Sequence, residues 1–246
     1  MRILIVAATP LEITPLVQSL VRPAPGQQVW RPALAGPDVR PRADTTSGSR
    51  ADTTSVVNTY SHRGHDIDVL VTGVGMVATA GWTVRVLAES QYDLALNLGV
   101  CGSFNRALPP GTVVHVTSDR IAELGAEDGD RFLSIDELGL PAEHTFVNAA
   151  IPENAALSRL PTVSAITVNT VHGSEESIAA VVRRCGPDVE SMEGAGFVHA
   201  CRIHGVVFAQ VRAVSNVVEK RNRMSWKLDQ AIEALNRAAL DILADV

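Results

Sequence analysis

Hydrophobic and polar positions divide the chain into short apolar runs separated by amphipathic segments. Residues 2–8 form a continuous apolar run with β-branched side chains, which is typical of a strand buried on both faces of a parallel sheet. Thr9, Pro10 and Glu12 follow, and these residue types are preferred at the cap and in the first turn of a helix. We therefore predict a central strand that passes directly into a helix ending near Leu20.

The same alternation continues along the rest of the chain. Further strands are predicted at residues 67–72, 93–98, 112–117, 163–168 and 206–214. Further helices are predicted at residues 76–90, after 174, after 191 and at 226–244. Because strands that alternate with helices form a sheet covered on both faces, we predict an α/β fold with a central mixed, largely parallel β-sheet flanked by helices. No change of composition divides the chain, so residues 1–246 are predicted to form a single domain.

Residues 23–55 interrupt this pattern. Pro, Gly, Ser and Thr dominate the segment, and the sequence RADTTS occurs at residues 42–47 and again at 50–55. Such a composition buries too little apolar surface to offset the loss of chain entropy on folding. We therefore predict a flexible insertion that takes no part in the chemistry.

Composition and charge narrow the class of protein. Hydrophobic residues at 46% and charged residues at 20% are close to globular averages, and a chain of 246 residues can bury a core without disulfides. The three cysteines lack the spacing of metal ligands. The apolar run at the first residues is too short for a signal peptide or a membrane span. We expect a cytoplasmic protein with no membrane partner. A net charge of −6 disfavours nucleic acid as a partner.

Two motifs with possible chemistry have simpler interpretations. Gly73-Val74-Gly75 resembles a dinucleotide fingerprint, but Rossmann folds carry it on the first strand–helix turn, which here has no glycine, so a tight structural turn is favoured. His62 and His65 lack a third ligand nearby in sequence, so no metal site is predicted. The sequence contains neither a nucleophile elbow nor a P-loop, which disfavours covalent serine hydrolysis and ATP chemistry.

Three polar residues lie where predicted strands end and helices begin. Glu12 either closes a capping box with Thr9 or is a carboxylate that activates water at the end of the central strand. Glu193 is either a partner of a helix dipole or a ligand-binding group, and Asn216 is either a turn former or a ligand-binding group. Ligands of open α/β sheets bind at the carboxyl ends of the strands, so the location of all three residues at strand ends favours a binding role.

Three segments carry a family resemblance. They are NLGVCGS at residues 97–103, VESMEGA at 189–195 and VRAVSN at 211–216. In order and spacing they resemble the signature segments of the nucleoside phosphorylase and nucleosidase superfamily, and the resemblance covers nearly all of the chain outside the insertion. The run from Ser215 to Arg223, with Trp226, is most similar to the futalosine hydrolases of the menaquinone pathway. The resemblance implies a cofactor-independent nucleosidase that releases hypoxanthine from futalosine, acting as a homo-oligomer of two or more subunits.

The resemblance also implies roles for individual residues. Glu12 is expected to be the base, Glu193 to bind ribose hydroxyls, and Met192 to pack against the sugar, while the backbone at Gly102 and Val171 lines the pocket. The segment at residues 97–103 lacks the arginine of the bacterial phosphorylases. A phosphate dianion beside Glu12 with no arginine partner would be repelled, which favours water as the nucleophile.

The far end of the expected pocket is aromatic and basic. Relatives have an aromatic residue at the position of Trp226, against the 5′ substituent, and an indole face suits an aryl tail. Arg221 and Arg223 either bind the carboxylate of that tail through forked hydrogen bonds or lie exposed on the surface.

Asn216 departs from the pattern of the related methylthioadenosine nucleosidases, which have an aspartic acid there to protonate adenine. An amide cannot act as an acid, but its two donors match the ring nitrogen and carbonyl of a 6-oxopurine. A 6-aminopurine leaves an unmatched group at a cost of about 1–3 kcal/mol, so hypoxanthine is the predicted leaving group. The alternatives are a methylthioadenosine or adenosylhomocysteine nucleosidase, a purine nucleoside phosphorylase and a non-catalytic nucleoside-binding protein.

Overall fold

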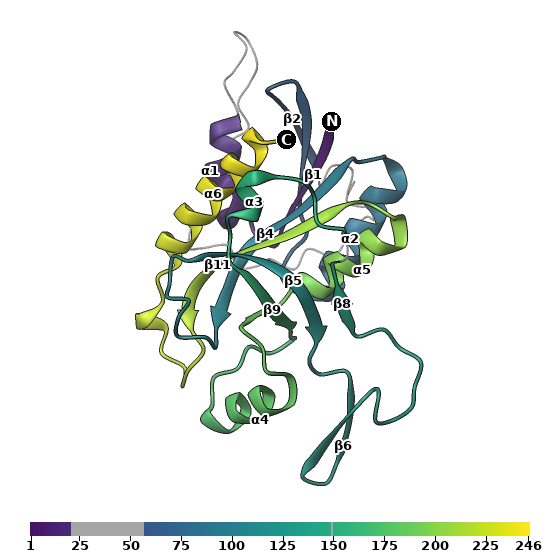
Figure 1. Ribbon diagram of the computed structural model, residues 1–246, viewed down its shortest axis with the longest axis vertical. Helices are drawn as coiled ribbons and strands as arrows, with labels where there is room; N and C mark the ends of the chain where they lie inside the picture. Colours follow the sequence, from purple (N-terminus) through teal and green to yellow (C-terminus); the bar gives the residue numbers. More distant parts are fainter. Residues whose placement is uncertain (21–56, 149) are drawn as a thin grey trace, which may run out of the picture.

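The computed structural model describes residues 1–20, 57–148 and 150–246, and the predicted insertion at 23–55 lies outside the described residues. A nine-stranded sheet runs through the protein with helices on both faces (Figure 1). The strands of this sheet are β1 (Arg2–Ala7), β2 (Val57–His62), β3 (His65–Val71), β4 (Leu94–Ser103), β5 (Val113–Ile121), β8 (Thr145–Val147), β9 (Thr162–Thr167), β10 (Val189–Ser191) and β11 (Phe208–Val217). A separate hairpin is formed by β6 (Gly125–Asp128) and β7 (Arg131–Ser134). The helices are α1 (Pro10–Leu20), α2 (Met76–Glu89), α3 (Ala155–Ser158), α4 (Glu175–Cys185), α5 (Gly194–His204) and α6 (Leu228–Ala244).

The core is built on both faces of the central strand. β1 pairs in parallel with β3 on one side and with β4 on the other, and β4 pairs in parallel with β11. Ile3 and Ile5 pack in the cluster that includes α1 and α6, whereas Leu4 and Val6 pack in the cluster that includes α2 and α5. Figure 1 shows these two helix pairs on opposite sides of the sheet. The predicted central strand, and the α/β fold with a mixed sheet, are thus confirmed.

The sheet also closes on itself at one end. The strand order is β10-β9-β5-β11-β4-β1-β3-β2, and β10 pairs a second time with the last residues of β4. In this antiparallel pairing Val189 lies opposite Ser103 and Glu190 lies opposite Gly102. Five strands therefore form a ring, and two of the signature segments become neighbours at the carboxyl end of β4.

The structure departs from the predicted elements mainly at short strands. β2, β10 and the strands between residues 122 and 148 have only three to six residues and lack a long apolar run, so periodicity did not indicate them. The last helix begins at Leu228 rather than at Trp226, because a 3-10 turn at Arg223–Ser225 comes first. Trp226 is accordingly held on the connection between β11 and α6.

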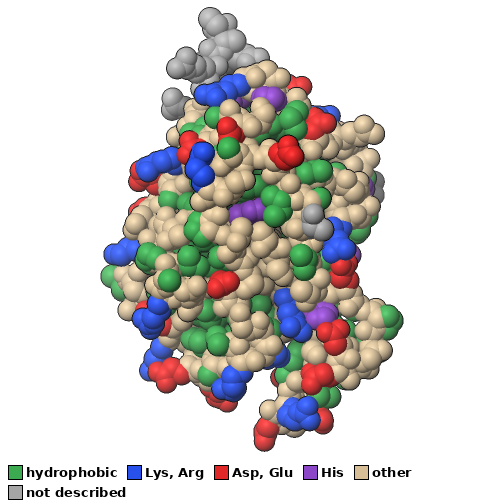
Figure 2. All heavy atoms as spheres, viewed as in Figure 1, with side chains coloured by type: hydrophobic (Ala, Val, Ile, Leu, Met, Phe, Trp, Pro, Cys, Tyr) green, Lys and Arg blue, Asp and Glu red, His purple; other side chains and the backbone are tan. Residues whose placement is uncertain are grey.

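The surface carries both kinds of charge. Acidic and basic side chains are interspersed over the face of the molecule seen in Figure 2. Within residues 1–20, 57–148 and 150–246, no helix combines the length and the apolar character that crossing a bilayer requires.

Candidate active site

A cavity of about 400 Å³ opens at the carboxyl ends of β1, β4 and β11. Eight of the nine predicted site residues line it, namely Glu12, Gly102, Val171, Met192, Glu193, Asn216, Arg221 and Trp226. The ninth, Arg223, is not part of the lining, although its guanidinium carbon lies 6.0 Å from the centre of the Trp226 ring. The fold therefore gathers residues from both ends of the chain around one space.

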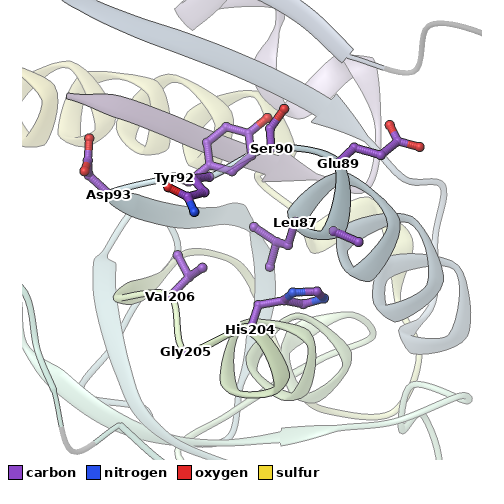
Figure 3. A pocket seen from close by; sticks show the side chains of 10 residues that line it. Leu87, Glu89, Ser90, Tyr92, Asp93, His204, Gly205 and Val206 are labelled. Carbon is purple, nitrogen blue, oxygen red and sulfur yellow. The ribbon is translucent and has the colours of Figure 1, made fainter.

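A second, larger cavity of about 690 Å³ lies at the opposite end of the sheet. Figure 3 shows its lining, which includes Tyr92 and Asp93 just before β4 and His204 at the end of α5. None of the predicted site residues lines it. Because ligands of α/β sheets bind at the carboxyl ends of the strands, the smaller cavity is the better candidate for the active site.

Glu12 sits in the first turn of α1 with only 7% of its surface exposed. Its Oε2 accepts hydrogen bonds from the backbone N–H and the hydroxyl of Thr9, both at 2.9 Å. Its Oε1 accepts a hydrogen bond from the backbone N–H of Val100 at 3.2 Å. The capping and the pocket-lining interpretations of Glu12 are therefore compatible, since the contacts that hold the helix end also fix the carboxylate at the cavity wall.

Arg212 is a charged residue of the site region that the sequence pattern does not identify as functional. It lies within β11, is 1% exposed and donates a hydrogen bond to Oδ1 of Asn97. A Cβ atom added to Gly99 would lie 2.6 Å from Nη1 of Arg212 and 3.2 Å from Oε1 of Glu12, so both side chains press against this glycine. The expectation that Glu12 has no arginine nearby is wrong. The one feature of the sequence that points to Arg212 is that it is a charged residue within the apolar run of a predicted strand.

Glu193 caps the N-terminus of α5 and is 8% exposed. Its Oε1 accepts the backbone N–H of Gly75 at 3.1 Å, and its Oε2 accepts the backbone N–H of Met192 at 3.3 Å. Gly73 and Gly75 have φ values of 86° and 105°, which favour glycine, so the turn between β3 and α2 is a structural one that also holds Glu193. Burial raises the pKa of Glu193 above its usual range, while the nearby Arg212 guanidinium opposes this shift.

Asn216 lies near the end of β11, after an irregularity in its register with β4 between Val214 and Asn216. Such a bulge redirects a side chain relative to the strand. The hydroxyl of Ser215 donates to Oδ1 of Asn216 at 2.8 Å, and Nδ2 of Asn216 donates to the carbonyl of Val217 at 3.0 Å. One amide N–H is therefore committed to the backbone, which leaves one donor for a ligand rather than the predicted two.

Glu190 belongs to the signature segment at residues 189–195, although the sequence does not identify it as a site residue. It lines the cavity, is 4% exposed, and accepts the backbone N–H of His172 at 3.1 Å, with 2.6 Å between its Oε2 and Nδ1 of the His172 ring. A Cβ atom added to Gly102 would lie 3.3 Å from Nδ2 of Asn216 and 3.5 Å from Cγ of Glu190. A carboxylate acceptor and an amide donor thus flank the same backbone position.

The connection after β11 supplies an aromatic and basic wall. Its backbone is fixed by a hydrogen bond from the N–H of Arg221 to the carbonyl of Gly173 at 3.1 Å. The guanidinium carbon of Arg221 lies 5.5 Å from the centre of the Trp226 ring, within the range of a cation–π interaction. This part of the cavity combines a flat apolar surface with positive charge.

Metal-ligating residues do not cluster in the part of the chain that the structure describes. No group of three or more His, Cys, Asp or Glu side chains is arranged to hold an ion there. His62 and His65 lie opposite each other at the turn between β2 and β3.

Comparison with known proteins gives one family model and several relatives. The model of the phosphorylase superfamily matches residues 2–244. A futalosine hydrolase of Streptomyces coelicolor is 34% identical over 180 residues, which cover 70% of this chain and 76% of that protein. A futalosine hydrolase of Thermus thermophilus is 31% identical over 181 residues, which cover 72% of this chain and 80% of that protein.

Solved structures share the fold. A methylthioadenosine/adenosylhomocysteine nucleosidase of Colwellia psychrerythraea in complex with adenine superposes with a TM-score of 0.73 at 20% identity, covering 100% of this chain and 95% of the other. The futalosine hydrolase of Helicobacter pylori superposes with a TM-score of 0.70 at 15% identity, covering 100% and 98% of the two chains. At these identities the structural likeness establishes the architecture.

Proposed function

Because the chain belongs to the phosphorylase superfamily and, within it, to the futalosine hydrolase family, we propose that its cavity hydrolyses the N-glycosidic bond of futalosine. The products are hypoxanthine and dehypoxanthinylfutalosine, and no cofactor takes part. The observation that carries the proposal is the gathering of Glu12, Glu193, Glu190 and Asn216 around one cavity at the carboxyl ends of the strands. The reaction belongs to the futalosine route to menaquinone.

Water is the nucleophile in this proposal, with Glu12 as its base. Cleavage of a ribosyl bond proceeds through a cation-like transition state, which the negative charge of Glu12 and Glu193 stabilises more than the neutral ground state. Arg212 lies near both Glu12 and Glu193, and because one guanidinium faces two carboxylates, the local charge stays negative. A phosphate dianion is repelled there, whereas a water molecule is not.

The leaving base is recognised by the pair formed by Glu190 and Asn216. A 6-oxopurine carries an N–H at position 1, which the Glu190 carboxylate accepts, and a carbonyl and a ring nitrogen, to which the remaining N–H of Asn216 donates. His172 holds Glu190 with its carboxylate against the cavity. Adenine has an acceptor at position 1 and a donor at position 6, so both groups are mismatched, each at a cost of about 1–3 kcal/mol.

The carboxyphenyl tail of futalosine is proposed to lie against Trp226. An aryl ring stacks on an indole face, and the guanidinium of Arg221 at the same wall supplies a forked donor for the carboxylate. Arg223 is the second cation at this aromatic ring, outside the cavity lining.

Product analysis tests the proposal. Purified protein is expected to release hypoxanthine from futalosine at a rate that does not depend on phosphate, without forming a sugar 1-phosphate. Glu12→Gln is expected to lower this rate by about 10²- to 10⁴-fold, the usual contribution of a general base. Glu89→Gln, at the cavity of Figure 3, is the matched control and is expected to keep the wild-type rate.

Three results would overturn the proposal: no release of hypoxanthine from futalosine, faster release of adenine from methylthioadenosine, or a rate that rises with phosphate. The homo-oligomer that the family resemblance implies stays a prediction, which light scattering of the purified protein would test.

A further inference from the structure

Asn236 is a buried polar residue of α6, 5% exposed, whose amide reaches a different helix. Its Nδ2 donates to the carbonyl oxygen of Glu12 at 2.8 Å and to the carbonyl oxygen of Ile232 at 2.7 Å. Its Oδ1 accepts the backbone N–H of Leu16 at 2.8 Å. Both amide hydrogens and the amide oxygen are therefore used, and two of the three bonds hold the backbone of α1.

The two groups of α1 that Asn236 binds are partners in a regular helix. In an α-helix the N–H of residue 16 donates to the carbonyl of residue 12. Pro15, immediately before Leu16, has no N–H and crowds the carbonyl four residues back, so it weakens the helix at this point. Side chains insert into a helix where its hydrogen-bond ladder is weakened in this way. The amide of Asn236 thus supports the turn that carries Glu12.

We propose that Asn236 is a positioning residue for Glu12, and this inference rests on the proposed function of Glu12 as the base. The amide fixes the main chain of Glu12 against α6, while Thr9 and Val100 fix its carboxylate, so the side chain is held from both ends. Catalytic groups must be held within about 0.5 Å of their working position. Removal of the Asn236 amide keeps the Glu12 carboxylate itself, but the turn of α1 that carries Glu12 loses its hydrogen bonds to α6.

Asn154 provides a matched control. It is 8% exposed, its Nδ2 donates to the carbonyl of Ile242 on α6 at 2.9 Å, and its Oδ1 accepts the backbone N–H of Leu157 at 2.8 Å. It therefore ties α3 to α6 with the same chemistry that ties α1 to α6. It does not line the candidate active-site cavity.

The first experiment compares Asn236→Ala with Asn154→Ala in the full chain. Both variants are expected to lower the melting temperature by similar amounts. Asn236→Ala is expected to lower kcat for futalosine by about 10²-fold with KM changed less than about twofold, since a displacement of about 1 Å costs a rate factor of this size. Asn154→Ala is expected to keep the wild-type kcat. A wild-type kcat for folded Asn236→Ala would overturn the inference.

A double-mutant cycle separates positioning from general loosening. In a Glu12→Gln background there is no base to position, so Asn236→Ala is expected to change the residual rate by less than about twofold. An undiminished loss in that background would overturn the inference. Should Asn236→Ala fail to fold, Pro15→Ala is added to restore the missing N–H of α1, and the double variant is compared with Pro15→Ala alone. The expected loss of kcat is then smaller but still specific to Asn236, and equal rates would overturn the inference.

The outcomes also distinguish this inference from the proposed function. If the wild-type protein releases no hypoxanthine, the function is wrong and the cycle has no signal. If the wild-type protein is active, Glu12→Gln is not, and Asn236→Ala retains the full kcat, only the role of Asn236 is wrong.

Discussion

Two buried carboxylates at opposite ends of the same sheet differ in the number of hydrogen bonds that they accept from the protein. At the amino end, Asp68 on β3 is fully buried and accepts Nε and Nη2 of Arg2 at 3.0 and 2.8 Å, the hydroxyl of Tyr92 at 2.7 Å and the hydroxyl of Thr59 at 2.5 Å. Burial alone raises the pKa of Asp68, but these four hydrogen bonds outweigh it and hold the pKa below its usual range. Asp68 is a carboxylate saturated by its donors.

Glu193 at the carboxyl end receives only two backbone hydrogen bonds, at 3.1 and 3.3 Å, and burial holds its pKa above the usual range. A carboxylate has about four lone-pair sites, so Glu193 keeps acceptor capacity directed at the cavity. A carboxylate whose lone pairs are all occupied by protein donors thus acts as a structural group, whereas one with free acceptor capacity inside a cavity is available to a ligand.

Glu193→Gln is expected to separate activity from stability most clearly. On the proposed role of Glu193 as the group that binds the ribose hydroxyls, the change removes two charge-assisted hydrogen bonds, each worth about 2 kcal/mol, so kcat/KM for futalosine should fall by about 10³-fold. Because the change also removes a buried charge with few donors, the free energy of unfolding should stay within about 1 kcal/mol of wild type. Steady-state kinetics measures kcat/KM, and urea unfolding measures the free energy of unfolding. A variant that loses stability but keeps its activity would contradict a ligand-binding role for Glu193.

Asp68→Asn is expected to show the reverse behaviour. It replaces an acceptor by an amide whose N–H groups face the donors of Arg2 and Tyr92, which should lower the free energy of unfolding by about 3 kcal/mol. The site is at the other end of the sheet, so kcat at a temperature where the variant is folded should equal that of wild type. Urea unfolding together with the futalosine assay measures the two effects.

Asp119 on β5 is an intermediate case that sharpens the comparison. It is 1% exposed and accepts the Thr167 hydroxyl at 2.8 Å and Nε2 of Gln210 at 2.9 Å. Burial raises the pKa of Asp119 to about 6, in spite of these donors. With only two hydrogen bonds, Asp119 therefore has a raised pKa, as Glu193 has, and not a lowered one, as Asp68 has.

The stability of the protein should consequently fall as the pH rises through the window of Asp119. The unfolded chain releases this proton near pH 4 and the native protein near pH 6, so the native state binds more protons in between and loses about 3 kcal/mol across the window. Asp119→Asn has no such titration. Urea unfolding at pH 4 and pH 7 should show that the wild type loses about 3 kcal/mol of unfolding free energy relative to Asp119→Asn as the pH rises, and a constant difference between the two proteins would contradict the shift.

Glu190→Gln tests a carboxylate that has a specific partner and still faces the cavity. His172 contacts both carboxylate oxygens of Glu190, with its backbone N–H at Oε1 and its ring Nδ1 at Oε2. With its amide oxygen kept on the backbone N–H of His172, the glutamine presents an N–H to position 1 of the purine, which suits adenine rather than hypoxanthine. The ratio of kcat/KM for futalosine to that for its 6-amino counterpart should fall by about 30-fold, equivalent to about 2 kcal/mol. Glu219→Gln, an exposed residue after β11, is the control that should leave the ratio unchanged.

Much of the site could be predicted because its residues belong to segments with local signatures. The buried strand β1 and the cap of α1 place Glu12 at a strand end, and the apolar run of β11 places Asn216 at another, so both lie at the edge where α/β sheets bind ligands. Arg212, Glu190 and Asn236 were missed for a different reason. Their roles depend on neighbours that are far away in sequence, such as the 224 positions between Asn236 and Glu12.

The sequence by itself determined the α/β alternation, the central strand and the strand-end location of the predicted acids, because hydrophobic period and capping are properties of a few consecutive residues. Only the tertiary structure decided that β10 closes on β4 and brings Glu190 and Asn216 to the same glycine, that Arg212 and Glu12 both lie beside Gly99, and that α6 supports the turn of Glu12. These contacts arise from which strands and helices become neighbours, and that choice is made by burial over the whole core rather than by any one segment.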